Sequence, residues 1–336
     1  MFRDIEEYIE LAKRDIDVNS FIKQISENEK RKVPIMLGGG LFKSDFPIHV
    51  SLDYLPMAES VLPPALSGKL LAKKMFHNHD FFELTYIFKG QFEHYIEDEK
   101  FVHDKSAISL LNPFVLHKFV PVNYDDIAVN ILMKESIIEE LYILHAESDN
   151  KLYRFFFDSI YGNESKNYLI LNNSDEVEGL ILGIIDEYMF KKPFFHQTVM
   201  AKLSNLFAII ARNYPKDTSS STRNKYPSHI RDILLYIRVR YASVTLDEVA
   251  KHFGYSCKYL SAMIKKNTGK NFSDIVFEYK LENACRYLTC SNIPIEKVNE
   301  IIGYKSVNNL YKVFIREFGL SPSEYRKQNY KYTAET

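Results

Sequence analysis

Tryptophan is absent from this sequence of 336 residues, and cysteine occurs only three times. Cys257, Cys285 and Cys290 form no C-x-x-C pair, and their spacing fits neither a zinc-ligand motif nor a disulfide framework. No apolar run approaches the ~18 residues that a membrane span needs, and the charged opening MFRDIEEYIE lacks the apolar segment of a secretory signal. These absences argue against a disulfide-rich secreted protein and against a membrane protein, and they predict a soluble protein of the cytoplasm.

The composition is that of a folded chain with an uneven distribution of charge. Hydrophobic residues make up 46% and aromatic residues 14% of the sequence, and the length fits two or three domains. The net charge of −1 conceals a basic C-terminal part, since from Tyr226 onward there are 17 Lys and Arg against 11 Asp and Glu. A basic module joined to an acidic one suggests contact with a polyanion, although this surplus alone is weak evidence.

The chain divides at a polar segment, KDTSSSTRNKYP, which cannot bury a face and is typical of a flexible linker. Residues 76–133 carry short alternating apolar runs, which predict an all-β barrel. Residues 175–213 hold two stretches of helical period whose apolar faces need a partner, either the barrel or a second subunit. The predicted segments are 1–69, an N-terminal helix and irregular chain; 70–135, the barrel; 136–215, a helical dimerisation region; 216–227, the linker; and 228–336, a helical domain.

An internal repeat occupies the helical domain. In its first copy, Thr245 and Glu248 form a T-x-x-E capping box, apolar residues follow at helical spacing, and Gly254 ends the helix before a second helix begins. The second copy has its turn at Gly303. The repeat therefore predicts two helix-turn-helix units, held at a fixed separation by a continuous helix between them.

The end of the repeat carries several residues at fixed spacings. They lie in PIEKVNEIIGYKSVNNLYKVFIREFGLSPSEYRK, after GYSCKYLSAMIKKNTGKNFSDIVFEYKLENACRYL. These two stretches resemble the DNA-binding domain of the AraC/XylS family of transcription regulators, over about residues 228–328. The most specific elements of this likeness are Gly303-Tyr304, Phe314, Phe318-Gly319, Ser321-Pro322 and Tyr325-Arg326.

Two positions depart from the family pattern. Asn299 stands where the family usually has Ala or another small residue, and a buried Asn costs ~1 to 3 kcal/mol if its amide is unpaired. We therefore expect looser packing of the second unit. Ala262 occupies the place where many relatives have a base-reading Arg, so a guanine-type contact is lost there, although its methyl group can meet a thymine methyl.

The two recognition helices predict a set of groove-facing side chains. We expect the residues directed away from the core to contact base edges or the groove. The plainer alternative is a solvated face, which is the usual position of charged helix residues. Asn308 stands out because an amide can pair bidentately with adenine. The predicted DNA contacts are Lys258, Ser261, Ala262 and Lys265 in the first recognition helix and Val307, Asn308, Tyr311 and Lys312 in the second.

The N-terminal half holds polar residues at strand spacing. His77, His79 and Glu83 are separated by even numbers, so a strand places them on one face, and the turn at Asn112-Pro113 delivers His117 to a later strand. The pattern resembles the two cupin motifs, H-x-H-x3-E-x6-G and a Pro-rich turn ending in His. AraC-type regulators often carry a cupin-like sensor, so the resemblance implies a barrel that binds an effector.

Three roles remain open for His77, His79, Glu83 and His117. They can line a small-molecule pocket, bind Mn, Fe, Ni or Zn, or serve only the hydrogen bonding of the barrel. We expect an effector site without metal or other cofactor, because sensor cupins commonly lack both metal and catalysis. Phe114 departs from the second motif, which usually has Gly or another small turn residue at that position.

The remaining side chains of the barrel segment have plainer predicted positions. We expect His94 and His103 at the surface or at a strand edge. Aromatic residues that alternate with polar neighbours, among them Phe82, Tyr86 and Phe92, are expected in the core.

Together these patterns predict a multidomain α+β protein, with an N-terminal cupin-like β barrel and helical pair and a C-terminal all-α domain of two helix-turn-helix units. The predicted function is a sequence-specific transcription regulator that binds double-stranded DNA as a homodimer. A small-molecule effector, such as a sugar or a related metabolite, is expected to control it, and no enzymatic activity is expected. The alternatives are a metal-dependent cupin enzyme with a DNA-binding appendage and an effector-independent activator that dimerises through its N-terminal half.

Overall fold

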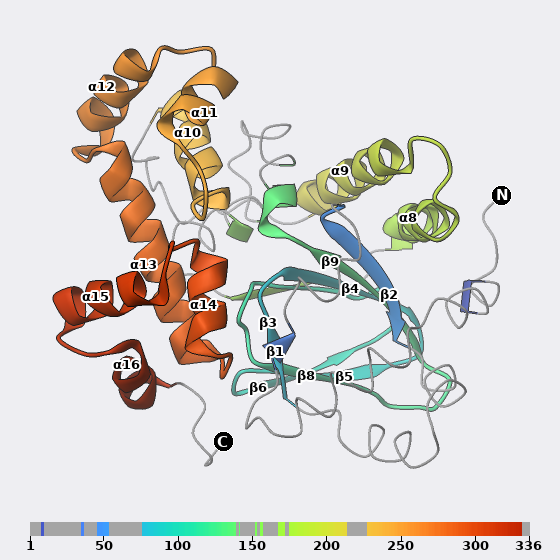
Figure 1. The fold of residues 1–336 in the computed structure, drawn as a ribbon. Helices are drawn as coiled ribbons and strands as arrows, with labels where there is room; N and C mark the ends of the chain where they lie inside the picture. Colours follow the sequence, from blue (N-terminus) through green and yellow to red (C-terminus); the bar gives the residue numbers. More distant parts are fainter. Residues whose placement is uncertain are drawn as a thin grey trace. The chain divides into compact units, whose positions relative to one another are not determined.

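The computed structural model describes residues 8–9, 35–36, 46–53, 76–138, 141, 152, 155–156, 167–171, 175–213 and 227–330 (Figure 1). The chain forms two compact units, Met1–Thr218 and Ser219–Thr336. Of the predicted linker at 216–227, only Pro227 is among the described residues. None of the described helices has the length and the apolar character that a bilayer crossing requires.

Two antiparallel sheets make up the core of the first unit. The five-stranded sheet has the order β10-β7-β4-β9-β2, and the three-stranded sheet has the order β6-β5-β8. The short strands β1 and β3 pair with each other in parallel. The strands are β1 (Ile35–Met36), β2 (Ile48–Asp53), β3 (Asn78–His79), β4 (Phe82–Lys89), β5 (Phe92–Ile96), β6 (Glu99–His103), β7 (Ile108–Leu111), β8 (His117–Pro121), β9 (Ile127–Met133) and β10 (Tyr168–Leu171).

The two sheets enclose a common interior, as the cupin-like prediction requires, although the described strands do not join into a single closed barrel. Ile87 of β4 packs in one buried cluster with Phe92 of β5 and Phe119 of β8. At a second buried cluster, Ile96 of β5 meets Leu111 of β7. Apolar side chains from both sheets therefore meet at two places in the space between them.

Strand β2 lies in a segment for which irregular chain was predicted. Its sequence IHVSLD alternates buried and half-buried residues, with Ile48, Val50 and Leu52 buried, and it pairs with β9 at the edge of the five-stranded sheet. A run of six alternating residues is a strand signal of its own. The many flanking prolines and glycines obscured that signal in the sequence.

Helices α8 (Glu178–Phe190) and α9 (Phe195–Asn213) pack on the outer face of the five-stranded sheet (Figure 1). A short 3-10 helix, Asp175–Val177, precedes α8. The hydroxyl of Tyr86 in β4 donates to Glu178 Oε2 at 3.2 Å, and the rings of Phe156 and Phe207 lie 5.3 Å apart. The apolar faces of the predicted helical pair are thus buried within their own unit.

The second unit consists of seven described helices in the predicted double arrangement. They are α10 (Ser228–Val239), α11 (Leu246–His252), α12 (Cys257–Thr268), α13 (Phe272–Cys290), α14 (Ile295–Ile302), α15 (Val307–Phe318) and α16 (Pro322–Asn329). The predicted capping box is present before α11, where Thr245 Oγ1 accepts from the Glu248 amide at 3.2 Å and Glu248 Oε2 accepts from the Thr245 amide at 2.8 Å. Helices α11 and α12 form the first helix-turn-helix unit, and α14 and α15 form the second.

Side chains of α10 and α13 connect the two helix-turn-helix units. Arg238 is 2% exposed and donates to both carboxylate oxygens of Glu282 at 2.7 and 2.8 Å. From α13, Lys280 Nζ donates to the carbonyl of Ala242 at 3.0 Å and to the carbonyl of Gly303 at 2.9 Å. Ala242 precedes the first helix-turn-helix unit, and Gly303 is the turn of the second. The Lys280 ammonium group therefore fixes both helix-turn-helix units to the central helix α13.

Asn299, the residue that departs from the family pattern, is buried in α14 with half of its amide satisfied. Its Nδ2 donates to the carbonyl of Tyr304 at 3.1 Å, whereas its Oδ1 has no hydrogen-bond partner among the described residues. The amide therefore ties α14 to the turn that follows. An unsatisfied buried oxygen is a cost of the kind predicted for this position.

Candidate functional site

The first recognition helix, α12, presents a polar face because its core contacts recur at helical spacing. Ser256 caps its start by accepting from the Tyr259 amide at 3.2 Å. Leu260 and Ile264 are buried, which directs other faces of the helix outward. Of the predicted DNA contacts in this helix, Lys258, Ala262 and Lys265 are exposed and Ser261 is half-buried.

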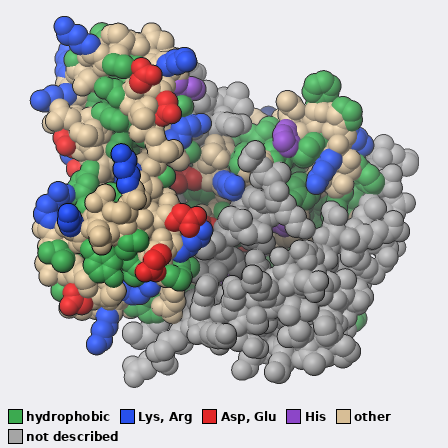
Figure 2. Space-filling model, viewed as in Figure 1, with side chains coloured by type: hydrophobic (Ala, Val, Ile, Leu, Met, Phe, Trp, Pro, Cys, Tyr) green, Lys and Arg blue, Asp and Glu red, His purple; other side chains and the backbone are tan. Residues whose placement is uncertain are grey.

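The second recognition helix, α15, has the same construction. Leu310 and Phe314 are buried, and Asn308 and Lys312 are exposed on the opposite side. Val307 and Tyr311 are half-buried, at the border between the core and the surface. In Figure 2, Lys and Arg side chains are spread over the surface of the helical unit, interspersed with acidic ones.

Tyr259 is a surface residue of α12 that the sequence analysis missed. Its side chain is 57% exposed, next to the predicted contact Lys258, and its ring lies 5.3 Å from that of Tyr255. The signal was its position one residue before the buried Leu260, which turns it away from the core.

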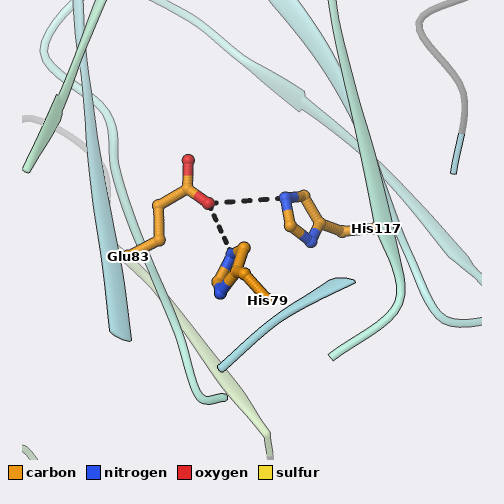
Figure 3. A group of neighbouring side chains, drawn as sticks. All are labelled: His79, Glu83 and His117. Carbon is orange, nitrogen blue, oxygen red and sulfur yellow. Dashed lines mark hydrogen bonds and ion pairs between the residues drawn. The ribbon is translucent and has the colours of Figure 1, made fainter. Parts of the chain in front are cut away.

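In the first unit, His79, Glu83 and His117 meet between the sheets (Figure 3). Glu83 Oε2 lies 2.7 Å from His79 Nε2 and 3.4 Å from His117 Nε2. All three residues are buried. The ring of the fourth predicted residue, His77, is half-buried and lies 4.2 Å from the ring of His117, centroid to centroid. The four side chains thus come together at one end of β4 and β8.

The backbone at Phe114 explains how the second motif keeps its turn without glycine. Phe114 has a φ of +67°, in the left-handed region that favours glycine. Its amide donates to the carbonyl of His79 at 2.7 Å, and its side chain is buried. Burial of the phenyl ring and this hydrogen bond offset the strain of the left-handed conformation.

The prediction of a surface or strand-edge position is wrong for His94, which is 1% exposed in the central strand β5. His103 lies in the edge strand β6, as the prediction allows, but it too is only 1% exposed. His94 Nδ1 lies 3.2 Å from His103 Nε2, and the ring of His94 lies 5.6 Å from that of His117. The sequence FEHYI carried the signal, because His94 alternates with Phe92 and Ile96 and must share their inward face.

A row of polar side chains from the five-stranded sheet also faces this interior. Thr85 pairs in register with Ser109 on one side and Asn130 on the other, so the three lie on the same face as Glu83. Thr85 Oγ1 donates to Asn130 Oδ1 at 2.9 Å. Ser109 Oγ is buried without a hydrogen-bond partner among the described residues. We call these three residues together with His79, Glu83, His94, His103 and His117 the inner chamber.

Burial and hydrogen bonding set the ionisation of the inner chamber. Burial opposes ionisation of Glu83, but hydrogen bonds with His117 and His79 outweigh it and hold the pKa of the carboxyl well below its usual value. Burial lowers the pKa of His103 to about 4, and burial with the neighbouring His117 and His103 lowers the pKa of His94 well below its usual value. The pair His94 and His103 is therefore neutral near pH 7.

Comparison with known proteins finds a matching family model for a segment of each compact unit. A family model described as "Helix-turn-helix domain" matches residues 249–328, and one described as "AraC-like ligand binding domain" matches residues 73–134. The multiple antibiotic resistance protein MarA of Escherichia coli is 32% identical over 110 residues, which are 32% of this chain and 87% of MarA. The chain belongs to the AraC/XylS family of transcription regulators.

Two further relatives differ in how much of the chain they match. The HTH-type transcriptional regulator YfiF of Bacillus subtilis is 22% identical to this AraC/XylS chain over 268 residues, 75% of the chain and 78% of YfiF. The regulator YtdP of the same organism is 32% identical over 87 residues, but the chain spans only 11% of its length. The eight predicted DNA contacts and the four predicted effector-site residues all lie within the segments that the two family models match.

Proposed function

We propose that this protein binds double-stranded DNA at specific sequences and regulates transcription under the control of a small molecule in its first unit. The observation that carries the proposal is the pair of recognition helices, α12 and α15, each exposing polar and basic side chains from a buried apolar base. The hydrogen bonds of Lys280 to the carbonyls of Ala242 and Gly303, one beside each helix-turn-helix unit, support a fixed spacing of α12 and α15. Such a pair fits successive major grooves on one side of the duplex, about 34 Å apart.

We propose that the base contacts come from the polar and small side chains of the two helices. Asn308 is exposed near the start of α15, the part of a recognition helix that reaches base edges, and its amide suits adenine. The exposed methyl of Ala262 suits a thymine methyl. The complete proposed set is Lys258, Ser261, Ala262, Lys265, Val307, Asn308, Tyr311 and Lys312.

Selection of duplexes from a randomised pool by the full-length protein tests this function. Affinity should fall with salt, by about 0.9 in the slope of log K against log salt for each neutralised phosphate. Asn308→Ala should cost about 1 to 3 kcal/mol at one base position, and Lys312→Ala should do the same if it reads a base, or weaken all sequences alike if it contacts a phosphate. The control is Lys100→Ala in the first unit, which removes the same charge and should leave binding unchanged. Absent or salt-independent binding contradicts the proposal.

We propose that the effector binds in the inner chamber, beside His77, His79, Glu83 and His117, and that the chain is not an enzyme. A chamber of hydroxyl, amide and imidazole groups suits a ligand with many hydroxyl groups, such as a sugar or a related metabolite. The buried Ser109 Oγ without a partner supports a polar ligand over a chamber filled by its own side chains. The absence of catalysis is supported by YtdP and YfiF, relatives whose names describe transcriptional regulators.

We further propose that the protein forms a homodimer through the turn between α8 and α9. The apolar faces of these helices are buried within the unit and no longer argue for a second subunit. Phe194 at that turn is 77% exposed, the highest value among the large apolar side chains of the described residues, and we propose that it contacts the second subunit. Sizing with light scattering at micromolar concentration should find a dimer, which Phe194→Ser should convert to a monomer. A monomeric parent chain, or a dimer unaffected by the substitution, contradicts this interface.

A further inference from the structure

Helices α12 and α15 can be compared position by position, because both have 12 residues and end in the same way. Each ends before a glycine in the left-handed conformation, Gly269 after α12 and Gly319 after α15. Aligned on these glycines, the two helices also bury their side chains at the same positions. The buried pairs are Leu260 with Leu310 and Ile264 with Phe314.

One row of side chains differs in chemical character between the two aligned helices. Residues four positions apart are neighbours along a helix surface, so every fourth residue from the start of each helix belongs to this row. In α12 the row is Cys257, Ser261 and Lys265, and in α15 it is Val307, Tyr311 and Ile315. The row of the first recognition helix therefore ends in an ammonium group, whereas the row of the second is aliphatic and aromatic along its whole length.

Ile315 lies on the side of α15 that carries the proposed DNA contacts. Its side chain is 56% exposed, and it occupies the position of Lys265, which is one of those contacts in α12. Asn308 and Lys312, both exposed, lie two turns and one turn before it on the same side of the helix. An exposed aliphatic side chain gains free energy when an apolar partner covers it. The position of Ile315 places that partner in the groove.

The second recognition helix also has less positive charge to offer to phosphates than the first. Helix α12 contains three lysines and no acidic residue, whereas α15 contains Lys312, Arg316 and Glu317. Arg316 is committed within the protein, since its Nε donates to Glu317 Oε1 at 2.6 Å and its guanidinium group lies 4.9 Å from the centre of the Phe277 ring. Helix α15 is thus better suited than α12 to apolar contact.

We propose that Ile315 contacts the C5 methyl group of a thymine and so selects thymine at one position of the half-site that α15 reads. The thymine methyl is the apolar group that base pairs present in the major groove. At 1.5 Å per residue Ile315 is about 10 Å along the helix axis from Asn308, so the two side chains contact different base pairs. The inference rests on the proposed function and adds a residue that was not among the contacts predicted from the sequence.

The test uses the full-length protein and the duplex that selection from the randomised pool yields. Each thymine of that duplex is replaced in turn by deoxyuridine, which lacks only the methyl group and keeps every hydrogen-bonding group of the base. For the parent chain, one replacement should weaken binding about threefold to fivefold, the factor that corresponds to one buried methyl group. For Ile315→Ala, the same replacement should leave binding unchanged.

A charged variant and a matched control complete the experiment. Ile315→Lys gives α15 the side chain that α12 has at this position. It should abolish the sensitivity to deoxyuridine and steepen the slope of log K against log salt by about 0.9, as one new phosphate contact requires. The control is Val102→Ala in β6, an aliphatic side chain that is 52% exposed in the first compact unit and should keep the binding pattern of the parent chain.

The outcomes separate this inference from the proposed function. A protein that binds a selected duplex but is insensitive to deoxyuridine at every thymine overturns the role of Ile315 and leaves the proposed function intact. Equal sensitivity of the parent chain and Ile315→Ala at each thymine also overturns it, since the side chain would then face a partner other than DNA. Failure of the folded parent chain to bind any duplex contradicts the proposed function and this inference with it.

Discussion

Gly303→Ala should destabilise the helical unit by about 2 to 5 kcal/mol, more than the same change at Gly254. Gly303 has a φ of +74°, in which an L-residue costs about 1 to 2 kcal/mol. A Cβ added there would lie 2.1 Å from the carbonyl oxygen of Ala242, a backbone atom that cannot move aside cheaply. Overpacking of this kind adds about 1 to 3 kcal/mol.

Gly254 is the matched control, because it lies at the equivalent turn of the first helix-turn-helix unit. Its φ is +71°, but a Cβ there would meet nothing within 4 Å. The difference between the two variants in urea unfolding, followed by helical ellipticity, therefore isolates the contact with Ala242. Equal costs would mean that the backbone conformation alone requires glycine. Because Gly303 also accepts from Lys280, we expect Gly303→Ala to weaken DNA binding as well.

Acidification from pH 7 to pH 5 should cost the first unit about 2 kcal/mol through His103 alone. Burial lowers the pKa of this ring to about 4, against 6.5 for its ordinary value. The folded state therefore keeps His103 neutral at pH 5, whereas the unfolded chain takes up a proton. The stability it contributes is complete above pH 6.5 and is lost as the pH falls toward 4, and the lowered pKa of His94 acts in the same direction.

Urea unfolding at the two pH values, followed by tyrosine fluorescence with chelator present, measures this effect. His103→Gln has no proton to gain, so its free energy of unfolding should change less between pH 7 and pH 5 than that of the parent chain. Parallel curves for both proteins would show that His103 is not the group that titrates. Because the pKa of Glu83 is lowered in the folded state, its carboxylate also contributes stability. That contribution is lost only as the pH falls below about 4.5.

Local periodicity and capping were sufficient to predict the helical unit. Thr245 and Glu248 form their predicted box, and Leu260, Ile264, Leu310 and Phe314 are buried as their spacing requires. These features depend on residues within a few positions of one another, so the sequence displays them directly. The fixed spacings between Gly303 and Arg326 were likewise sufficient to show the resemblance to the AraC/XylS family from the sequence.

The first unit was predicted less completely, because its site depends on pairings between distant strands. Even spacing put His79 and Glu83 on one face, and the turn placed His117 nearby, but nothing local joined Thr85 to Ser109 and Asn130. His94 was misplaced and the burial of His103 was missed, because both rings are covered only once the two sheets pack together. Strand β2 was likewise taken for irregular chain, since its partner β9 lies far along the sequence.

The sequence by itself determined the division into a strand-rich and a helical part, the two helix-turn-helix units and the outward faces of their recognition helices, because all of these follow from short-range periodicity. Only the tertiary structure decided which nitrogen of His79 and His117 faces Glu83, and why Gly303 must be glycine. Both depend on groups distant in sequence, a carboxylate in one case and the carbonyl of Ala242 in the other. Only packing of the folded chain brings such groups within bonding distance.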